Sequence, residues 1–147
     1  MRVSAKGEYA LRALLDLAQH GGHGLRPIQE VAARQGIPQR YLEQVLLQLR
    51  RAGLLEARRG SAGGYRLRRP TDQVTVGEVL RAVEGSMPRA EGVPPGRGPV
   101  FGAAADLTEL WRDIDEAVSG VVDHVTLEDL RRRAEERRSS ARPMYHI

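Results

Sequence analysis

The sequence contains no cysteine, a single lysine and few aromatic residues, which make up 4% of its 147 positions. Without cysteine, the chain has no thiol nucleophile, no thiolate ligand for zinc and no cysteine-ligated iron–sulfur cluster. No apolar run approaches the roughly 18 residues that a membrane-spanning helix needs. The first residues, 1–7, lack the apolar segment of a signal peptide. We therefore expect a cytoplasmic protein with neither a metal site nor another cofactor.

Positive charge is concentrated in the first half of the chain. Residues 1–70 hold 13 basic and 5 acidic side chains, a net charge of +8, whereas residues 71–147 hold 10 and 14, a net charge of −4. An arginine-rich genome would explain why arginine replaces lysine, but it would not explain this asymmetry. The first half is therefore predicted to contact a polyanion such as a nucleic acid.

Three short helices are expected in the first 51 residues. Apolar residues at three- and four-residue spacing predict a helix over 8–19, and Pro27 and Gly36 delimit a second over 28–35. A third follows closely over 39–51, a connection typical of a helix-turn-helix. Its inward face is predicted to consist of Tyr41, Leu42, Val45, Leu46 and Leu49.

A β-hairpin is expected after the third helix. The period changes to that of a strand over 54–59 and again over 65–68. The turn between them is Gly-Ser-Ala-Gly-Gly, a sequence suited to unusual backbone angles. A helix-turn-helix followed by a hairpin predicts a winged helix. The predicted fold is therefore mainly α with a small β-hairpin.

The second half is predicted to consist of helices that flank a loop rich in glycine and proline. Thr75 starts a helix with capping-box spacing, and the longest apolar stripe runs over 106–124. No intrachain core remains for this stripe, so we expect it to pair with a second copy of the chain through Leu107, Leu110, Trp111, Ile114, Val118, Val121 and Val122. The predicted organisation is a winged helix-turn-helix domain over 1–84, a flexible loop over 85–104, a dimerisation helix and a short following helix over 105–138, and a tail over 139–147.

The third helix carries the strongest functional signal. A recognition helix presents polar groups to base edges while its other face packs on the domain. A solvated helix face would have the same composition, and we weigh that alternative against DNA contact. The polar residues expected at DNA are Gln39, Arg40, Glu43, Gln44, Arg50 and Arg51.

The hairpin supplies a second basic element. Arg58 and Arg59 precede its turn, and Arg66, Arg68 and Arg69 follow it. Arginines beside a Gly-rich turn can approach phosphates or a narrow minor groove. An ordinary hairpin with charged edges is the alternative, and only the neighbouring helix-turn-helix favours the DNA interpretation.

Catalytic patterns are missing from the sequence. It has no Gly-Lys-Ser/Thr phosphate loop, no Gly-x-Ser-x-Gly motif and no dinucleotide fingerprint. His20 and His23 are better explained as solvated turn residues than as metal ligands. We therefore predict that the protein is not an enzyme.

Several motifs resemble the Rrf2 family of bacterial winged-helix regulators. Tyr-Leu-Glu-Gln at 41–44 and Arg-Gly-x-x-Gly-Gly-Tyr at 59–65 are the most specific. Lys-Gly-Glu-Tyr-Ala at 6–10, Thr-Val-Gly-Glu-Val at 75–79 and Thr-Leu-Glu-Asp-Leu at 126–130 extend the resemblance. It covers residues 1 to about 132.

The resemblance implies a dimer that is held by the long helix and binds a pseudo-palindromic DNA operator. It implies major-groove contacts from Gln39, Arg40, Tyr41, Glu43 and Gln44, and a minor-groove contact from Arg59. It further implies that the turn follows the DNA backbone through Ser61, Ala62, Gly63, Gly64 and Tyr65. One departure is Pro38, where many members have a serine that caps the helix.

Family members that bind an iron–sulfur cluster carry three cysteines and a further ligand. The corresponding positions here are about Val93, Pro99, Ala105 and Thr108, which are not suitable ligands. With Glu-Leu-Trp at 109–111, Asp-Glu-Ala-Val at 115–118 and Thr-Leu-Glu-Asp-Leu at 126–130, the second half most resembles cluster-free members that repress cysteine metabolism. That resemblance implies a complex with cysteine synthase (O-acetylserine sulfhydrylase), with the ending Tyr145-His146-Ile147 as a partner-binding tail and the Ile147 carboxylate entering the partner's active site. A frayed end is the alternative for this tail.

The function expected from the sequence is a homodimeric, sequence-specific DNA-binding repressor, tied to cysteine or sulfur metabolism. Two alternatives stay open. One is a regulator of the same fold that senses another small molecule or a redox signal near Trp111 and the loop 85–104. The other is a protein-interaction adaptor that does not bind DNA.

Overall fold

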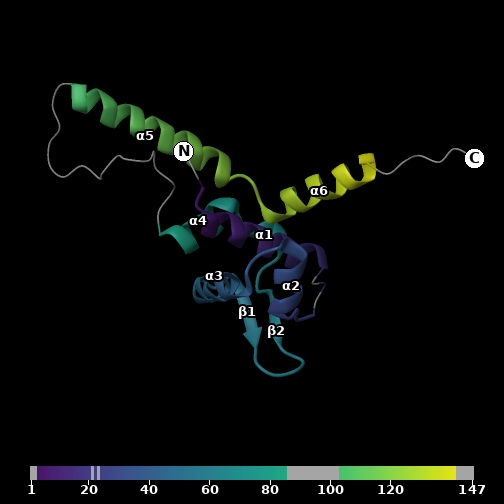
Figure 1. Cartoon of the computed structure of the whole chain (residues 1–147). Coiled ribbons are helices and arrows are strands. Elements are labelled where there is room, and N and C mark those ends of the chain that lie inside the picture. Colours follow the sequence, from purple (N-terminus) through teal and green to yellow (C-terminus); the bar gives the residue numbers. More distant parts are fainter. Residues whose placement is uncertain (1–2, 21, 23, 86–102, 142–147) are drawn as a thin grey trace, which may run out of the picture.

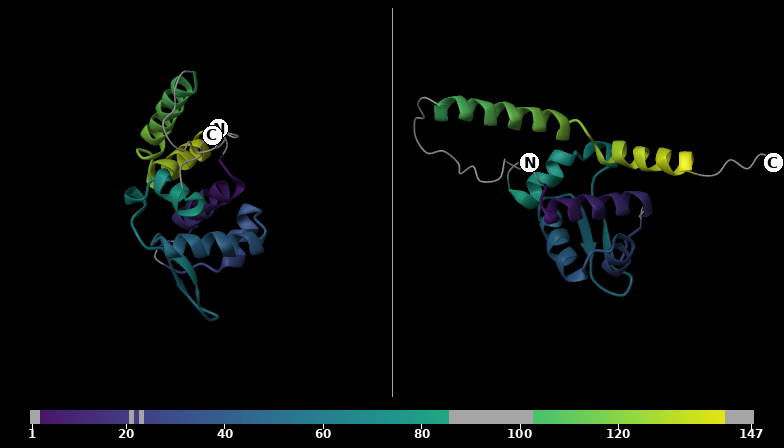
Figure 2. Two further views of the ribbon diagram at one scale, coloured as in Figure 1. Left: turned by 90° about the vertical axis from the view of Figure 1, so that its left-hand side faces the viewer. Right: turned by 45° about the horizontal axis from the view of Figure 1, so that its top comes forward.

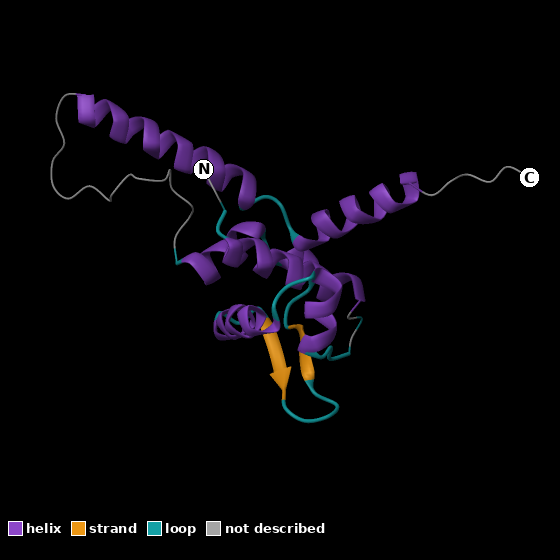
Figure 3. Ribbon diagram, viewed as in Figure 1, coloured by secondary structure: helices purple, strands orange, loops and turns teal. Residues whose placement is uncertain are grey.

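The structure is a computed structural model that describes residues 3–20, 22, 24–85 and 103–141. Helices dominate, and one hairpin supplies the two strands of the described residues (Figure 3). This arrangement confirms the predicted winged helix-turn-helix followed by a long helix. The elements in chain order (Figure 1) are α1 (Ala5–His20), α2 (Ile28–Gln35), α3 (Gln39–Arg51), β1 (Leu55–Arg58), β2 (Gly64–Leu67), the 3-10 helix η1 (Thr71–Gln73), α4 (Val76–Glu84), α5 (Ala103–Val122) and α6 (Leu127–Ala141).

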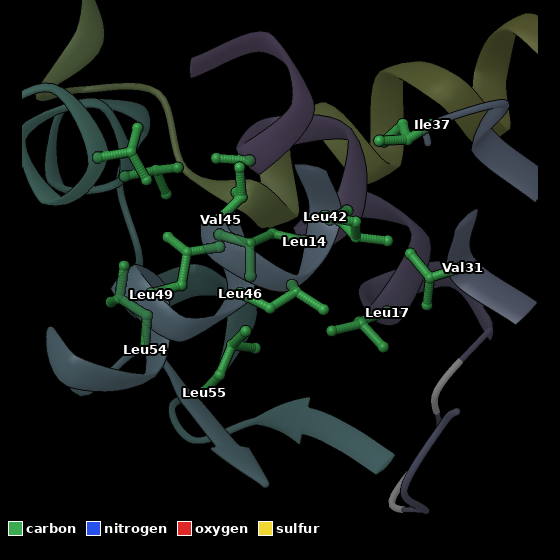
Figure 4. Close-up of a cluster of buried hydrophobic side chains, with 14 of the residues drawn as sticks. Leu14, Leu17, Val31, Ile37, Leu42, Val45, Leu46, Leu49, Leu54 and Leu55 are labelled. Carbon is green, nitrogen blue, oxygen red and sulfur yellow. The ribbon is translucent and has the colours of Figure 1, made fainter. Parts of the chain in front are cut away.

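The hydrophobic core lies where α1, α3 and the hairpin meet (Figure 4). Leu14 of α1 and Leu46 and Leu49 of α3 are completely buried, and Leu55 of β1 is nearly so. Burying one such side chain stabilises the fold by about 1.5–3 kcal/mol relative to leaving it exposed. The core therefore fixes α3 and the hairpin to a common base.

Helix α1 begins at Ala5, three residues before the start that the apolar pattern predicts. Ser4 caps it: its side-chain oxygen accepts a hydrogen bond from the Gly7 N–H at 3.1 Å, and its carbonyl accepts one from the Glu8 N–H at 3.0 Å. The apolar stripe starts only at Tyr9, so the period alone could not locate this earlier start.

Helices α2 and α3 have the bounds that the sequence predicts. Gly36 ends α2 in the left-handed region with a φ of 62°, a conformation that favours glycine. Pro38 precedes α3 and gives it no side-chain cap. Ile37 between them is buried and joins the core. The short turn thereby holds the two helices in a fixed relation.

The hairpin pairs β1 with β2 in antiparallel register, with Leu55 opposite Leu67 and Arg58 opposite Gly64. Arg26 adds a short third edge, because its N–H donates to the Tyr65 carbonyl at 2.9 Å and its carbonyl accepts from the Tyr65 N–H at 2.8 Å. At Gly63, a Cβ atom would overlap the backbone carbonyl of Arg58. The tight turn therefore depends on a glycine there.

The first turn of α6 packs back onto the winged helix. Leu127 is completely buried within the core cluster, and its N–H donates to the Val74 carbonyl at 2.9 Å. Thr126 and Asp129 form a capping box: the Thr126 N–H donates to the Asp129 carboxylate at 2.9 Å, and the Asp129 N–H donates to the Thr126 hydroxyl at 3.1 Å. The sequence-based division grouped this segment with the long helix as a short element ending near 138, whereas α6 continues to Ala141.

Helix α5 extends away from the winged helix. It lies with α6 on the side of the molecule opposite the hairpin (Figures 1 and 2). Its C-terminal end is tied to α4, where Arg81 donates two hydrogen bonds of 2.7 Å to Asp123. None of the helices in the described ranges is long and apolar enough to cross a membrane.

Candidate nucleic-acid interface

Helix α3 divides cleanly into an apolar and a polar face. Leu42, Val45, Leu46 and Leu49 are buried. All the polar residues that the sequence assigned to DNA on this helix are exposed: Gln39, Arg40, Glu43, Gln44, Arg50 and Arg51. The helix therefore offers amide, guanidinium and carboxylate groups outward from a rigid base, as a recognition helix must.

Tyr41 lies on the exposed face, where 62% of its surface is accessible. The period placed it on the inward face with Leu42, and that expectation is wrong. Leu47 of the same helix is also exposed, with 41% of its surface accessible. An aromatic ring and a leucine thus stand among the polar groups of α3, and neither contributes to the core.

The wing presents its basic and small residues at the turn. Arg58, Arg59, Ser61 and Ala62 are exposed, while Gly63 and Gly64 are half-buried. Tyr65, which the family resemblance placed along the DNA backbone, is half-buried and packs against the core cluster.

Ion pairs separate the arginines of this region into two groups. Arg66 donates to Glu56 at 2.7 Å, and Arg69 pairs with Glu78 at 2.5 Å. Within the ranges that the structure describes, no carboxylate pairs with the remaining arginines of α3 and the wing: Arg40, Arg50, Arg51, Arg58, Arg59 and Arg68. These six exposed guanidinium groups carry charge that an external anion can neutralise.

Helix α3 and the wing lie on the same side of the molecule. Figure 1 shows α3 beside β1, with the hairpin projecting away from α5 and α6. A duplex that meets α3 therefore also lies within reach of the wing, and the long helix stays clear of it.

A buried acidic residue that no sequence motif indicated orients α2. Asp16 of α1 is completely buried and accepts hydrogen bonds from Arg34 at 2.7 and 2.9 Å and from Gln35 at 3.0 Å. Burial opposes its ionisation, but the bonds from Arg34 and Gln35 outweigh that cost and lower its pKa. Both donors belong to the last turn of α2, directly before the turn that leads into α3. An acid between the apolar residues of the predicted first helix was the available signal.

The residues expected at a dimer interface form a stripe on α5. Leu107, Leu110 and Val121 are 49%, 46% and 63% exposed. The other four are half-buried: Trp111, Ile114, Val118 and Val122. Within the single described chain, this stripe is not covered by a core.

Two groups of expected residues fall outside the described residues. The tail, Tyr145, His146 and Ile147, lies beyond residue 141, and most of the loop 85–104 lies in the undescribed range 86–102. The roles expected for these residues therefore remain predictions from the sequence.

Comparisons with known proteins identify relatives over most of the chain. The Rrf2 family model, described as an iron-dependent transcriptional regulator, matches residues 3–133. The HTH-type transcriptional regulator IscR of Photobacterium profundum is 39% identical over 133 residues, which cover 90% of this chain and 76% of that protein. IscR of Sodalis glossinidius is 40% identical over 131 residues, covering 88% and 78%.

Solved structures agree with the sequence relatives. CymR (YrzC), the global cysteine regulator of B. subtilis, superposes with a TM-score of 0.73 at 34% identity, covering 90% of this chain and 98% of that one. IscR of T. potens gives a TM-score of 0.77 at 32% identity, covering 99% and 94%. These relatives are named as regulators and not as enzymes, in agreement with the sequence prediction.

The donor groups of this chain do not fit a cysteine-ligated iron–sulfur cluster. The whole sequence lacks cysteine, and the described residues contain no group of three or more histidine or acidic side chains that could hold a metal ion. Of the positions aligned by resemblance with cluster ligands, Val93 and Pro99 lie outside the described residues, while Ala105 and Thr108 fall in α5.

Proposed function

Because the chain belongs to the Rrf2 family of winged-helix transcriptional regulators, which bind DNA, we propose that it is a homodimeric, operator-binding repressor of cysteine or sulfur metabolism genes. The observation that carries this proposal is the exposed polar face of α3 beside a basic wing. Helix α3 enters the major groove, and the wing reaches the adjacent minor groove.

The first two turns of α3 select the sequence. Arg40 recognises guanine, Gln39 and Gln44 recognise adenine, and Glu43 accepts a hydrogen bond from the amine of cytosine. Tyr41 adds a contact from the same face. The exposure of these side chains supports their role, since the opposite face of the helix is committed to the core.

The wing and the end of α3 supply affinity. Arg59 enters the minor groove, where a narrow groove concentrates negative potential. Arg50, Arg51 and Arg58 contact phosphates, and Ser61 and Ala62 follow the backbone. The turn that carries them is held by Gly63, Gly64 and Tyr65. The lack of ion pairs on these arginines within the described ranges supports this assignment.

Two copies of the chain join through α5. Three of its large apolar residues are about half exposed or more, and a second copy would cover the stripe with an equivalent one. Two copies of α3 then read half-sites separated by about one helical turn, roughly 34–36 Å.

The link to cysteine metabolism is supported by the likeness to the global cysteine regulator of B. subtilis. The sequence itself contains no cysteine. A regulator without thiolates needs a signal other than a cysteine-ligated cluster. We assign that signal to a complex with cysteine synthase, which binds the tail 145–147.

Selection of bound genomic fragments, followed by sequencing, tests DNA binding and identifies the operator. We expect enrichment of palindromic sites near genes of sulfur metabolism and a dimer by light scattering. Arg59→Ala weakens binding to the selected operator in electrophoretic shift assays. A monomer, or a protein that enriches no fragment, would contradict the proposal.

Co-purification with cysteine synthase tests the partner separately. The full chain is expected to retain the enzyme, whereas a chain that lacks residues 145–147 is expected to lose it while binding the operator normally. Equal retention by both chains would remove the tail from the proposal and leave DNA binding intact.

A further inference from the structure

A basic hollow, which we call the wing hollow, lies where the end of α3 meets the wing. It is bounded by arginines from three separate segments: Arg50 at the end of α3, Arg58 of β1, and Arg66 and Arg68 at and beyond the end of β2. Leu25, Leu55, Glu56 and Ala57 complete its lining. Arginines distant in sequence therefore converge on one site.

The single carboxylate of this hollow is already neutralised. Glu56 lies directly opposite Arg66 in the strand register and accepts its hydrogen bond at 2.7 Å. That bond and the charge of Arg66 lower the pKa of Glu56, and the charges of Arg68 and Arg58 lower it further. Glu56 is thus ionised at neutral pH and bound to Arg66. It therefore does not neutralise the other arginines of the hollow.

Three guanidinium groups remain available around the hollow. Within the described ranges, no carboxylate pairs with Arg50, Arg58 or Arg68. Arg68 is anchored through its backbone, because its N–H donates to the Leu54 carbonyl at 3.1 Å. Convergent guanidinium donors of this kind suit the oxygens of a phosphate group.

Another hollow of the described surface shows the contrast. The hollow on α6 combines one arginine, Arg132, with two glutamates, Glu135 and Glu136. Its formal charge is negative, whereas the wing hollow has four arginines and one glutamate. The excess of unpaired cations therefore distinguishes the wing hollow from the hollow on α6.

The position of the hollow relates it to a DNA strand. One sugar–phosphate backbone separates a major groove from the adjacent minor groove, so it must pass between a helix in the first and a wing in the second. The wing hollow is lined by both the end of α3 and the strands of the wing. We propose that it binds a backbone phosphate of the operator strand between the two grooves, with Arg68 as a phosphate contact alongside Arg50 and Arg58. This inference rests on the proposed DNA binding.

The salt dependence of operator binding tests the inference. Each phosphate contact adds about 0.9 to the slope of log affinity against log salt concentration. We expect Arg68→Ala to reduce that slope by about 0.9, which narrows the ratio of Kd values between 50 and 200 mM salt by roughly threefold. Arg133→Ala, an exposed arginine of α6, is the matched control and should leave the slope unchanged.

A second variant distinguishes a phosphate site from a structural role for the arginines. Glu56→Gln removes the negative charge beside the phosphate, so it should leave operator affinity equal or raise it. Arg68→Ala and Glu56→Gln should both retain the folded circular dichroism spectrum and preference for the operator over random DNA. A loss of operator affinity in Glu56→Gln would contradict the proposal.

The remaining outcomes separate the two levels of inference. If the unaltered chain binds no DNA, the proposed function fails. If the unaltered chain binds the operator, but its slope of log affinity against log salt concentration equals that of Arg68→Ala, only the phosphate site is overturned. If, in addition, inorganic phosphate raises the melting temperature of the unaltered chain but not of Arg68→Ala, the hollow binds free phosphate instead of the DNA backbone.

Discussion

The winged helix buries its apolar side chains, whereas helix α5 leaves several of its own exposed. In the winged helix, leucines from α1, α3 and β1 are buried against one another, and even the first turn of α6 contributes Leu127 to that core. In α5, Leu107, Leu110 and Val121 remain about half exposed or more. The winged helix therefore completes its own core within the described residues, whereas the apolar stripe of α5 does not.

This difference implies that the winged helix determines the stability of the fold and that α5 determines association between chains. A core change in the winged helix should act on folding, because that core is contained within one chain. A change on α5 should act on association, because its stripe gains burial only from another surface. The five predictions that follow compare these two regions and the surfaces beside them.

The largest effect is expected from a cavity in the core. Leu46→Ala removes a completely buried side chain from α3 and should lower the free energy of unfolding by about 2–5 kcal/mol. Leu47→Ala, at the neighbouring 41% exposed position, should change it by less than about 0.5 kcal/mol. Urea denaturation measures both. Equal losses of unfolding free energy in the two variants would show that the Leu47 side chain is also buried.

The next effect concerns α5 and should spare the fold. Leu110→Asp places a carboxylate in the proposed dimer interface, where burying an unpaired charge costs several kcal/mol. We expect the dimer Kd to rise by at least about 100-fold, or roughly 2.7 kcal/mol, with the helical spectrum retained. Arg112→Asp puts the same charge on the opposite side of α5 and serves as the control. Dissociation by both variants alike would refute the assigned stripe.

A smaller effect is expected from the buried acid that orients α2. Asp16→Asn removes the charge that Arg34 and Gln35 bind and should cost about 1.5–3 kcal/mol of stability at neutral pH. Glu30→Gln alters an exposed contact of 3.4 Å to the same Arg34 and should cost less than about 1 kcal/mol.

The same residue predicts how stability depends on pH. The pKa of Asp16 is lower in the folded state than its ordinary value of 3.8. Its contribution is therefore fully present above pH 3.8 and is lost as the pH falls through the lower, folded-state pKa. Melting curves between neutral pH and about pH 2 should fall less steeply in Asp16→Asn than in the unaltered chain. Parallel curves would show that Asp16 is not the linked group.

The sequence was most informative where local chemistry decides the structure. Pro27, Gly36 and the change of period after Arg51 located α2, α3 and the hairpin, because these signals act within a few residues. Leu127 gave no comparable signal: its bond joins it to Val74, more than 50 positions earlier, and only the tertiary fold brings them together. Tyr41 failed for a related reason, since a helical period cannot tell a core aromatic from one at the margin of the face.

The candidate site shows the same limit. The polar face of α3 and the arginines of the wing were visible as patterns, yet their pairing was not. Glu56 and Arg66 are ten positions apart and become partners only through the strand register. Likewise, Asp16 could be suspected as an acid among apolar residues, but its binding by Arg34 depends on the packing of α1 against α2.

The smallest effect should come from base selection, where neither folding nor association changes. Glu43→Ala removes an exposed carboxylate from the second turn of α3 and should reduce discrimination at one operator base pair by about 1 kcal/mol, the lower end expected for a base contact. Binding to single-base operator variants, measured at constant salt, provides the comparison. Glu136→Ala on α6, also exposed, should preserve the order of preference among those variants. Because the Glu43 carboxylate repels phosphates, its loss should leave the average affinity for the operator variants equal or higher. Weaker binding to all variants alike would indicate a structural role for Glu43 instead.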